Sequence, residues 1–304
     1  MTLRAAIAAS VAYDTIMVFD GKFTDHILPD QIHKINLSFL SPRMRREYGG
    51  CAGNIAYTLR HLGGTPLVKA ALGNDGHDYL ARLSGWGLDT SLVHVAGDAY
   101  TAQAIIITDQ DNNQITAFHP GAMQLAHATS ISGDKGITLA IIAPDGRDAM
   151  LQNAKQLHAL KIPFMFDPGQ QLPMFDGDAL RVFADQASWI AVNDYEAAML
   201  CDRMGTTLDA LSNSKLRGVI VTLGAQGCDV WQQGRKTHVP GLKASAIVDP
   251  TGCGDAVRGA LLYGLQQGWP LERCAALGNR LGALKIAHRG GQNHPIGPEL
   301  LAGL

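Results

Sequence analysis

The sequence predicts an α/β fold in which one mostly parallel central sheet is covered by helices on both faces. Short apolar runs, each ending near Gly, Asp or Asn, alternate along the chain with segments of helical periodicity. The runs are "LRAAIAASV", "PLVKAALG", "TLAIIAPDG", "PFMFDPG", "WIAVND" and "GVIVTLG". Continuous apolar strands separated by helices are typical of parallel sheets buried on both faces. The 304 residues, 46% of them hydrophobic, are enough to form the core of such a fold.

Several segments carry apolar residues at roughly helical spacing. The expected helices span residues 53–62, 76–84, 147–160, 194–203, 254–267 and 271–288. The sequence shows no internal repeat, no low-complexity tract and no linker. We therefore expect residues 1–304 to form a single folding unit.

Two regions break the alternation because they are rich in strand-forming residues and lack long helices. They are residues 15–48 and about 97–120. In the second region, two β-favouring runs flank the turn-forming "DQDNN", which predicts a hairpin. We expect both regions to form one small sheet that covers the mouth of the main domain as a lid. Exposed edges of such a sheet favour a partner strand, so a homodimer through the lid is expected.

Charge and cysteine content argue against several classes of protein. The formal net charge is −2, and Lys and Arg are scattered among acids, so no basic stripe is available for a nucleic-acid backbone. No apolar run is long enough to span a membrane. The five cysteines show no C-x-x-C spacing, which argues against a disulfide framework and a structural zinc. We therefore expect a cytoplasmic protein with a small-molecule partner.

A glycine-rich junction, "DPTGCGDAVRGALLYGL", opens one of the expected helices near the end of the chain. Gly252, Cys253 and Gly254 are small residues at a helix start, where unpaired N–H groups and the helix dipole favour an anion. Asp255 follows directly and would lie beside that anion. The alternative is a tight turn in which Asp255 is an ordinary acid of a first helical turn.

A second glycine-rich junction, "EYGGCAGNIAYTLRHLGG", precedes the expected helix over 53–62. Gly49, Gly50 and Gly53 would let backbone amides approach a ligand, and Asn54 offers both a donor and an acceptor. This combination suits a polyhydroxy substrate. The alternative is a strand-to-helix turn with Asn54 as a local cap. Neither junction is a P-loop or a dinucleotide fingerprint.

Together the two junctions resemble the two signatures of the PfkB family, the ribokinase-like carbohydrate kinases. The positions that match the first signature are Gly49, Gly50, Ala52, Asn54, Ala56, Gly63 and Gly73. Those that match the second are Asp249, Pro250, Gly252, Gly254, Asp255, Gly259 and Ala260. The family landmarks "AYD", "FHPGA", "NDYEA", "VTLGAQG" and "RGGQ" also occur in order, so the resemblance covers the whole chain. It implies the ribokinase-like fold.

The resemblance implies the residues of phosphoryl transfer. Asp255 matches the family's catalytic base, which accepts the proton of the attacking hydroxyl. The amides of Gly252, Cys253 and Gly254 would form the anion hole, although Cys253 replaces the family's usual Ala or Gly. Arg258 lies one helical step further on, which makes it a candidate for a phosphate contact; the alternative, which we expect, is an exposed helix residue.

The resemblance also implies ATP, Mg²⁺ and K⁺ as cofactors. "NDYEA" is similar to the family's N-x-x-E element, in which Asn193 and Glu196 organise ATP phosphates and water-bound Mg²⁺. The other residues matched to nucleotide contacts are Thr222, Gly224, Gly227 and Asn279. The residues matched to a monovalent-cation site, which backbone carbonyls of "AHRGG" would close, are Asp249, Thr251 and Gly290.

Asp14 matches the acid that binds adjacent sugar hydroxyls at the end of the family's first strand, and one carboxylate can accept from both hydroxyls of a diol. Gly49, Gly50 and Asn54 are the other expected substrate contacts. The lid residues expected against a base are Phe118, Phe39 and Met123, and the alternative for all three is packing within the lid. The residues that point to a nucleoside include "SVAYDTIM" and "FDPGQ", which resemble bacterial adenosine or broader nucleoside kinases.

The resemblance therefore implies an ATP-dependent kinase that phosphorylates the 5′-hydroxyl of adenosine, and of other nucleosides, in purine salvage. A ribokinase-type sugar kinase and a non-catalytic nucleoside-binding protein stay open as alternatives. Intact Asp255, Asn193 and Glu196 argue against the non-catalytic protein.

Overall fold

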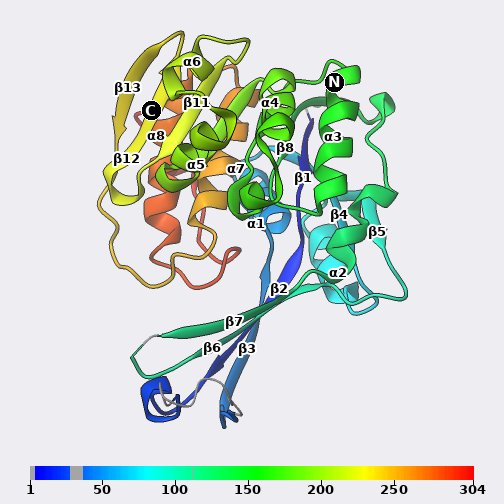
Figure 1. The fold of residues 1–304 in the computed structure, drawn as a ribbon, viewed down its shortest axis with the longest axis vertical. Coiled ribbons are helices and arrows are strands. Elements are labelled where there is room, and N and C mark those ends of the chain that lie inside the picture. The colour runs from blue at the N-terminus through cyan, green and yellow to red at the C-terminus, as the bar shows by residue number, and fades with distance from the viewer. Residues whose placement is uncertain (1–3, 28–36, 112) are drawn as a thin grey trace.

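A large, mostly parallel sheet runs through the main body of the molecule (Figure 1). The computed structural model describes residues 4–27, 37–111 and 113–304. Within these ranges the strands of the large sheet are, in spatial order, β13 (Arg235–Pro240), β12 (Gly227–Gln232), β11 (Gly218–Thr222), β10 (Trp189–Asn193), β9 (Phe164–Phe166), β8 (Ile137–Ile142), β1 (Arg4–Ala8), β4 (Thr65–Leu72) and β5 (Asp89–Val95). Neighbouring strands from β11 to β5 are parallel, whereas β12 is antiparallel to both β11 and β13. The predicted α/β fold is confirmed.

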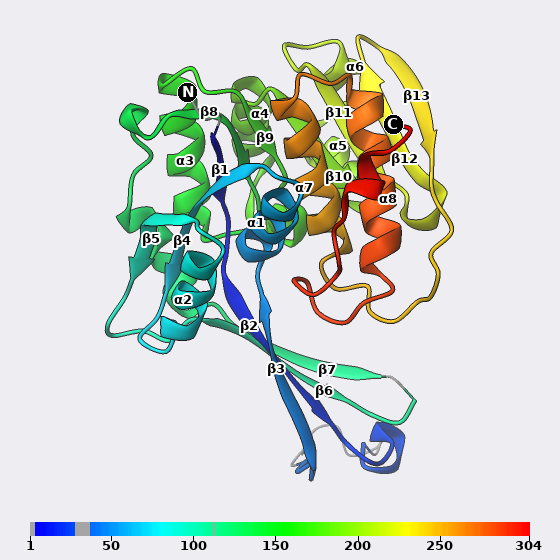
Figure 2. The same ribbon diagram turned by 180° about the vertical axis from the view of Figure 1, so that it is seen from behind.

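Helices cover both faces of this sheet, as the two opposite views show (Figures 1 and 2). The helices on one face are α3 (Arg147–Ala159), α4 (Gly177–Gln186), α5 (Asp194–Met204) and α6 (Leu208–Ser212). Those on the other face are α1 (Cys51–His61), α2 (His77–Gly85), α7 (Cys253–Gln266) and α8 (Leu271–Lys285). Short 3₁₀ helices are η1 (Phe23–Asp25), η3 (Gly121–Ala128), η4 (Gly133–Lys135), η5 (Gly169–Met174), η6 (Gly224–Gln226) and η7 (Pro298–Leu301). None of the helices in the described ranges is long and apolar enough to cross a membrane.

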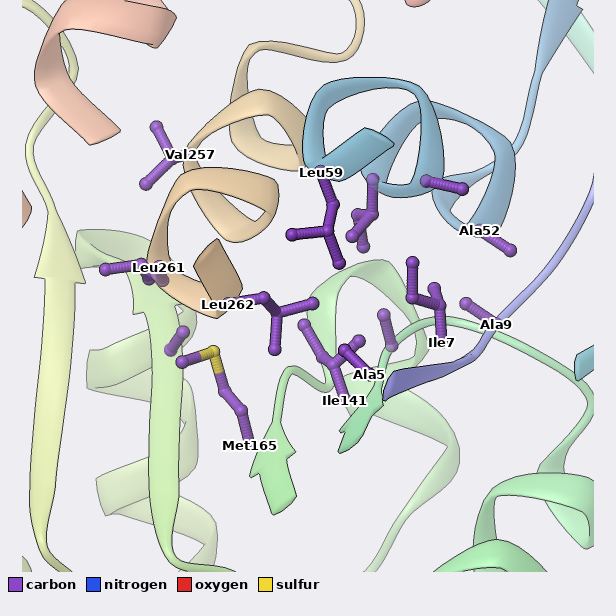
Figure 3. Packing of buried hydrophobic residues seen from close by; sticks show 14 of the residues in the cluster. Ala5, Ile7, Ala9, Ala52, Leu59, Ile141, Met165, Val257, Leu261 and Leu262 are labelled. Carbon is purple, nitrogen blue, oxygen red and sulfur yellow. The ribbon is translucent and has the colours of Figure 1, made fainter. Parts of the chain in front are cut away.

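The expected helices are all present, whereas α4, α6, β5, β12 and β13 were not predicted. Both unpredicted helices begin at a capping residue, because the Asp176 side chain accepts from Ala179 N and the Thr207 side chain accepts from Ala210 N. Each face of the sheet has its own apolar core. Figure 3 shows Leu59 of α1 and Leu262 of α7 packing over Ile7 and Ile141 of the sheet.

A second, smaller sheet projects from the main body (Figure 1). Its strands, in spatial order, are β3 (Arg43–Gly49), β2 (Ala12–Val18), β6 (Ala102–Thr108) and β7 (Gln114–His119). Both predicted strand-rich regions contribute to it, and β6 and β7 form the predicted hairpin. Within those regions, residues 28–36 and 112 lie outside the described residues.

The resemblance led us to expect Asp14 at the end of the first strand, but it does not lie there. That strand, β1, ends at Ala8, and Asp14 is the third residue of β2 in the second sheet. The chain changes sheets at the link between these strands, where Ser10 N donates to Pro144 O (2.9 Å). The acid is therefore carried by the second sheet.

The cross-strand register places the two substrate-binding candidates Asp14 and Phe118 on the same face of the second sheet. Glu47, Asp14, Ala104 and Phe118 are successive partners across the strands. On the opposite face the corresponding row contains Met44 and Ile115, which are exposed. The homodimer predicted through this sheet stays a prediction.

Helices α1 and α7 pack closely because α7 presents a glycine at their contact. A Cβ atom on Gly259 would lie 2.6 Å from the Thr58 Cβ and 3.1 Å from the Ile55 carbonyl oxygen. Thr58 and Ile55 are fully buried in α1, so they have little room to move. This contact sets the distance between Asn54 on α1 and Asp255 on α7.

Replacing Gly259 by Ala should therefore destabilise the protein. We expect Gly259→Ala to lower the free energy of unfolding in urea by about 1–3 kcal/mol, because the added methyl group forces α1 and α7 apart. The control is Gly85→Ala at the end of α2, where a Cβ would meet no atom within 4 Å. That variant should be neutral or slightly stabilised. A Gly259→Ala protein as stable as the control would contradict the close packing.

Candidate active site

A cleft of about 580 Å³ opens at the edge of the large sheet where the parallel strands end. Its lining includes Cys51, Pro144, Asp167, Gly169, Gln170, Asn193, Glu196, Thr222, Gly224, Gly254, Asp255 and Arg258. Chain order along the sheet reverses between β1 and β8, and ligands of open α/β sheets bind at such switch points. The structure thus brings together the predicted residues Asn193, Glu196, Thr222, Gly224, Gly254 and Asp255.

Asp255 lies in the first turn of α7, beside the side chain of Asn54. Within the described chain α7 begins without a side-chain cap, at Gly252, whose φ of +79° favours glycine. Asn54 Nδ2 donates to Asp255 Oδ2 (2.8 Å), so Asn54 does not act as a local cap. The pKa of Asp255 is raised to about 6, mainly by burial and also by the charge of Asp167, while the hydrogen bond from Asn54 opposes the shift. Above that pH the carboxylate is ionised and able to accept a proton.

A buried network on the other side of Asn54 fixes its orientation. Gln292 Nε2 donates to Asn54 Oδ1 (3.2 Å) and to the Tyr79 hydroxyl (2.7 Å). Arg82 Nε donates to Gln292 Oε1 (3.0 Å), and the Tyr79 hydroxyl donates to Gly49 O (2.6 Å). Because Asn54 Oδ1 is used as an acceptor, its amide nitrogen must face Asp255. Gln292 was not predicted as a site residue, although it ends the landmark "RGGQ".

Gly49 makes room for Asp14. A Cβ on Gly49 would lie 2.5 Å from Asp14 Oδ2, and Gly50 has a φ of +80° where it precedes α1. Burial raises the pKa of Asp14 to about 6, and the charges of Asp249 and Asp255 add to the shift. Asp14 therefore approaches this region from the second sheet, and Asp255 approaches it from the start of α7.

Phe118, Phe39 and Met123 have different environments. Phe118 shares its row with Asp14 and keeps 49% of its surface exposed, so its ring is available to a ligand. Phe39 packs against Phe19 and Phe23, with ring centroids 4.9 and 5.1 Å away. Met123 is buried against apolar residues at the base of the second sheet. Phe39 and Met123 are therefore packing residues.

Arg258 is not the exposed helix residue that the sequence led us to expect. It is only 4% exposed, and its Nε donates to Asp167 Oδ2 (2.9 Å) while Nη2 donates to Ala191 O (3.2 Å). Its position one turn after Asp255 points it into the cleft, where Asp167 supplies a buried counter-charge. Asp167 was also missed, although it directly follows a short apolar strand in "FDPGQ". The Cys51 thiol, likewise not predicted, interacts with Asp255.

Asn193 and Glu196 form a capping box at the start of α5. Asn193 Oδ1 accepts from Glu196 N (2.7 Å), and Glu196 Oε2 accepts from Asn193 N (2.8 Å). Burial raises the pKa of Glu196, while the Asn193 amide opposes the shift. No cluster of three or more His, Cys, Asp or Glu suited to a metal occurs in the described parts of the chain. A Mg²⁺ ion beside Glu196 would fit as one that keeps most of its ligands as water and phosphate oxygens.

Two of the predicted nucleotide contacts support the polypeptide around the cleft. Gly227 begins β12 with a φ of +102°, and its carbonyl accepts from Leu223 N (2.8 Å). Asn279 Nδ2 donates to Val239 O and Pro240 O, both at 3.0 Å. Neither residue is among those that line the cleft.

The residues predicted for the monovalent cation and the anion hole lie together around the start of α7. Asp249 Oδ1 accepts from Thr251 N and Oδ2 from Gly290 N, both at 2.9 Å. Gly290 thus contributes its N–H group to this contact. Of the three predicted anion-hole amides, that of Cys253 donates to Pro250 O (3.2 Å), whereas Gly254 lines the cleft.

The chain is similar to solved structures of nucleoside kinases. The nucleoside kinase of Burkholderia thailandensis in complex with inosine is 47% identical, with a TM-score of 0.85 over 95% of this chain and 93% of that one. The nucleoside kinase of Methanocaldococcus jannaschii, an archaeal member of the ribokinase family, is 26% identical, with a TM-score of 0.89 over 99% and 97%. The predicted ribokinase-like fold is therefore confirmed.

Curated relatives agree with this similarity. The Methanocaldococcus jannaschii nucleoside kinase is 28% identical over 262 residues, 85% of each chain. That of Methanothermobacter thermautotrophicus is 26% identical over 292 residues, 92% of each chain. The family model for pfkB family carbohydrate kinases matches residues 14–296. With this match and the cleft at the switch point of the sheet, the chain belongs to the pfkB family of carbohydrate kinases, phosphotransferases that act on hydroxyl groups.

Proposed function

We propose that this protein transfers the γ-phosphoryl group of ATP to the 5′-hydroxyl of a nucleoside, with adenosine and other purine nucleosides as acceptors. The observation that carries the proposal is the Asp255 carboxylate, held by Asn54 at the start of α7 and facing the region that Asp14 approaches from the second sheet. The Burkholderia thailandensis enzyme, solved with inosine and with ADP-inosine, supports a purine nucleoside as acceptor.

The acceptor would be oriented by Asp14 and activated by Asp255. The Asp14 carboxylate would accept hydrogen bonds from the 2′- and 3′-hydroxyls of ribose, which places the 5′-hydroxyl toward Asp255. As the hydroxyl oxygen bonds to the γ-phosphorus, its proton passes to the Asp255 carboxylate. The bond between the γ-phosphorus and the β–γ bridging oxygen breaks, and ADP leaves.

The negative charge of the transferred group would be stabilised at the start of α7. The amides near Gly252 and Gly254 point out of the helix N-terminus, where the dipole favours an anion. Arg258 lines the same cleft, although Asp167 already balances most of its charge. Glu196 and Asn193 would hold Mg²⁺ through water, and bound Mg²⁺ supplies further neutralisation of the phosphate oxygens.

The remaining contacts would position the two substrates. Thr222 and Gly224 line the cleft beyond Glu196, where they are available to the nucleotide. Phe118, on the face of the second sheet that carries Asp14, would stack on the nucleoside base. This sheet would act as the lid of the acceptor site.

A substrate panel tests the proposal directly. We expect adenosine or inosine to give a kcat/KM about 100-fold above that of ribose or fructose 6-phosphate, measured as ADP release with the product identified by mass spectrometry. Phe118→Ala should raise KM for nucleosides roughly fivefold or more and leave KM for ribose unchanged, because only the nucleoside has a base to stack. Turnover of the sugars alone would establish the ribokinase-type alternative, and nucleoside binding without any ATP-dependent product would establish the non-catalytic one.

Replacing Asp255 by Asn should lower kcat by about 10²–10⁴-fold, because the general base is lost. In the wild-type protein kcat/KM should fall as pH drops below about 6, where Asp14 and Asp255 become protonated. The pKa of Asp255 is higher in the folded protein than in the unfolded chain. The free energy of unfolding should therefore fall as pH rises to about 6, where the buried carboxylate ionises. Asn cannot ionise, and the variant should therefore melt no lower than wild type at pH 8. Near-normal turnover by Asp255→Asn would remove this residue from the base role.

Two substitutions separate the metal role of Glu196 from its capping role. Glu196→Gln keeps an acceptor for Asn193 N and should retain the melting temperature, yet raise the Mg²⁺ concentration for half-maximal activity by about 10-fold or more. Glu196→Ala loses the cap as well and should also melt lower. An unchanged Mg²⁺ requirement in Glu196→Gln would leave the pair with a structural role alone.

A further inference from the structure

The loop before the anion hole is held by a buried ammonium group. Lys285, the last residue of α8, is fully buried, and its Nζ donates to Asp249 O (2.8 Å) and His288 O (2.9 Å). These acceptors are backbone carbonyls from the two segments, "DPTG" and "AHRGG", in which the sequence predicts a monovalent-cation site. The carbonyl oxygens therefore already converge on a positive charge that belongs to the chain.

A free K⁺ ion does not fit this donor set. It would need carbonyl oxygens that Lys285 Nζ already occupies, and the ammonium would repel it at short range. Both oxygens of Asp249, the predicted carboxylate ligand, accept backbone N–H groups. The contact between Gly290 and Asp249 is made by the Gly290 N–H group, a hydrogen-bond donor that cannot bind a cation. The carbonyl oxygens held by Lys285 and the carboxylate of Asp249 are thus both unsuited to K⁺.

The ammonium is also close to the reacting groups. A Cβ on Gly252 would lie 3.7 Å from Lys285 Cε, so the lysine chain runs beneath the residue that opens α7. Burial lowers the pKa of Lys285, while the charges of Asp249 and Asp255 act in the opposite direction. A tethered point charge at this position can fix the loop that sets the anion-hole amides.

We propose that Lys285 replaces the monovalent cation, so that this protein positions its anion-hole loop without K⁺. The catalytic part of this inference rests on the proposed phosphoryl transfer, whereas the structural part does not. Lys285 is a positioning residue, because it acts through the loop of residues 249–252 and touches no reacting atom. If Lys285 only supported the end of α8, its removal would also destabilise the fold. An added K⁺ ion would then not restore the stability of the variant.

The test compares cations at equal ionic strength, with tetramethylammonium as the cation that is too large to bind. Wild-type protein should show the same melting temperature and the same kcat, within about twofold, in tetramethylammonium and in K⁺. Lys285→Ala opens space for an ion. It should melt lower in tetramethylammonium, and K⁺ or NH₄⁺ should raise its melting temperature and restore kcat by about 10-fold or more.

Two matched variants make the result specific. Lys285→Met fills the same space without a charge, so K⁺ should not rescue it. Lys69→Ala removes a second fully buried ammonium, one that donates to Ala126 O (2.6 Å), and should lose stability without rescue. Rescue of either variant to the same extent as Lys285→Ala would overturn the proposal.

The melting temperatures are measured without substrates, so this test stands even if the nucleoside assignment fails. K⁺ activation of the wild-type protein, with a higher melting temperature, would overturn the replacement. So would a Lys285→Ala protein that no cation rescues in either readout. If Lys285→Ala does not fold, the wild-type comparison still decides between a tethered and a free cation.

Discussion

The contact between the Asn54 carboxamide and the Asp255 carboxylate depends on how closely two helices can approach. Gly259 brings α7 against Thr58 of α1. One turn away, Asn54 Nδ2 and Asp255 Oδ2 then lie 2.8 Å apart. Gln292 fixes the remaining acceptor of Asn54 from a third segment. The Asp255 carboxylate is thus oriented by helix packing, which the apolar cores on both faces of the sheet keep in place.

Acidic groups accumulate at the edge of the sheet that must receive a polyphosphate. Burial and the charges of Asp249 and Asp255 raise the pKa of Asp14, and the buried cation Arg258 is paired with Asp167. In the proposed reaction, affinity for phosphate would therefore come mainly from backbone amides, the helix dipole and the proposed Mg²⁺. The excess of acidic groups at this edge also explains why the buried Lys285 ammonium, which donates to the carbonyl of Asp249, is electrostatically favourable there.

Much of the fold follows from local patterns, because parallel strands and amphipathic helices leave periodic apolar signals. The hairpin of β12 and β13 was missed, since its tight turn at Gln233 and Gly234 uses positive φ at a residue that seldom adopts it. The glycine-rich junctions predicted Asp255 and Asn54 as site residues. Arg258 and Lys285 were not predicted in their observed roles, because their partners, Asp167 and the carbonyl of Asp249, are distant in sequence. Only tertiary structure shows which charges are buried together.

The space that Gly49 leaves for Asp14 also limits how this site can evolve. Any side chain at position 49 would begin 2.5 Å from an Asp14 carboxylate oxygen, so it would displace the acid proposed to bind the sugar. A shorter acid does not exist among the natural amino acids, and moving β2 would disturb its pairing with β3. We therefore expect positions 14 and 49 to be constrained together, because a side chain at position 49 is compatible only with a different placement of the acid at position 14.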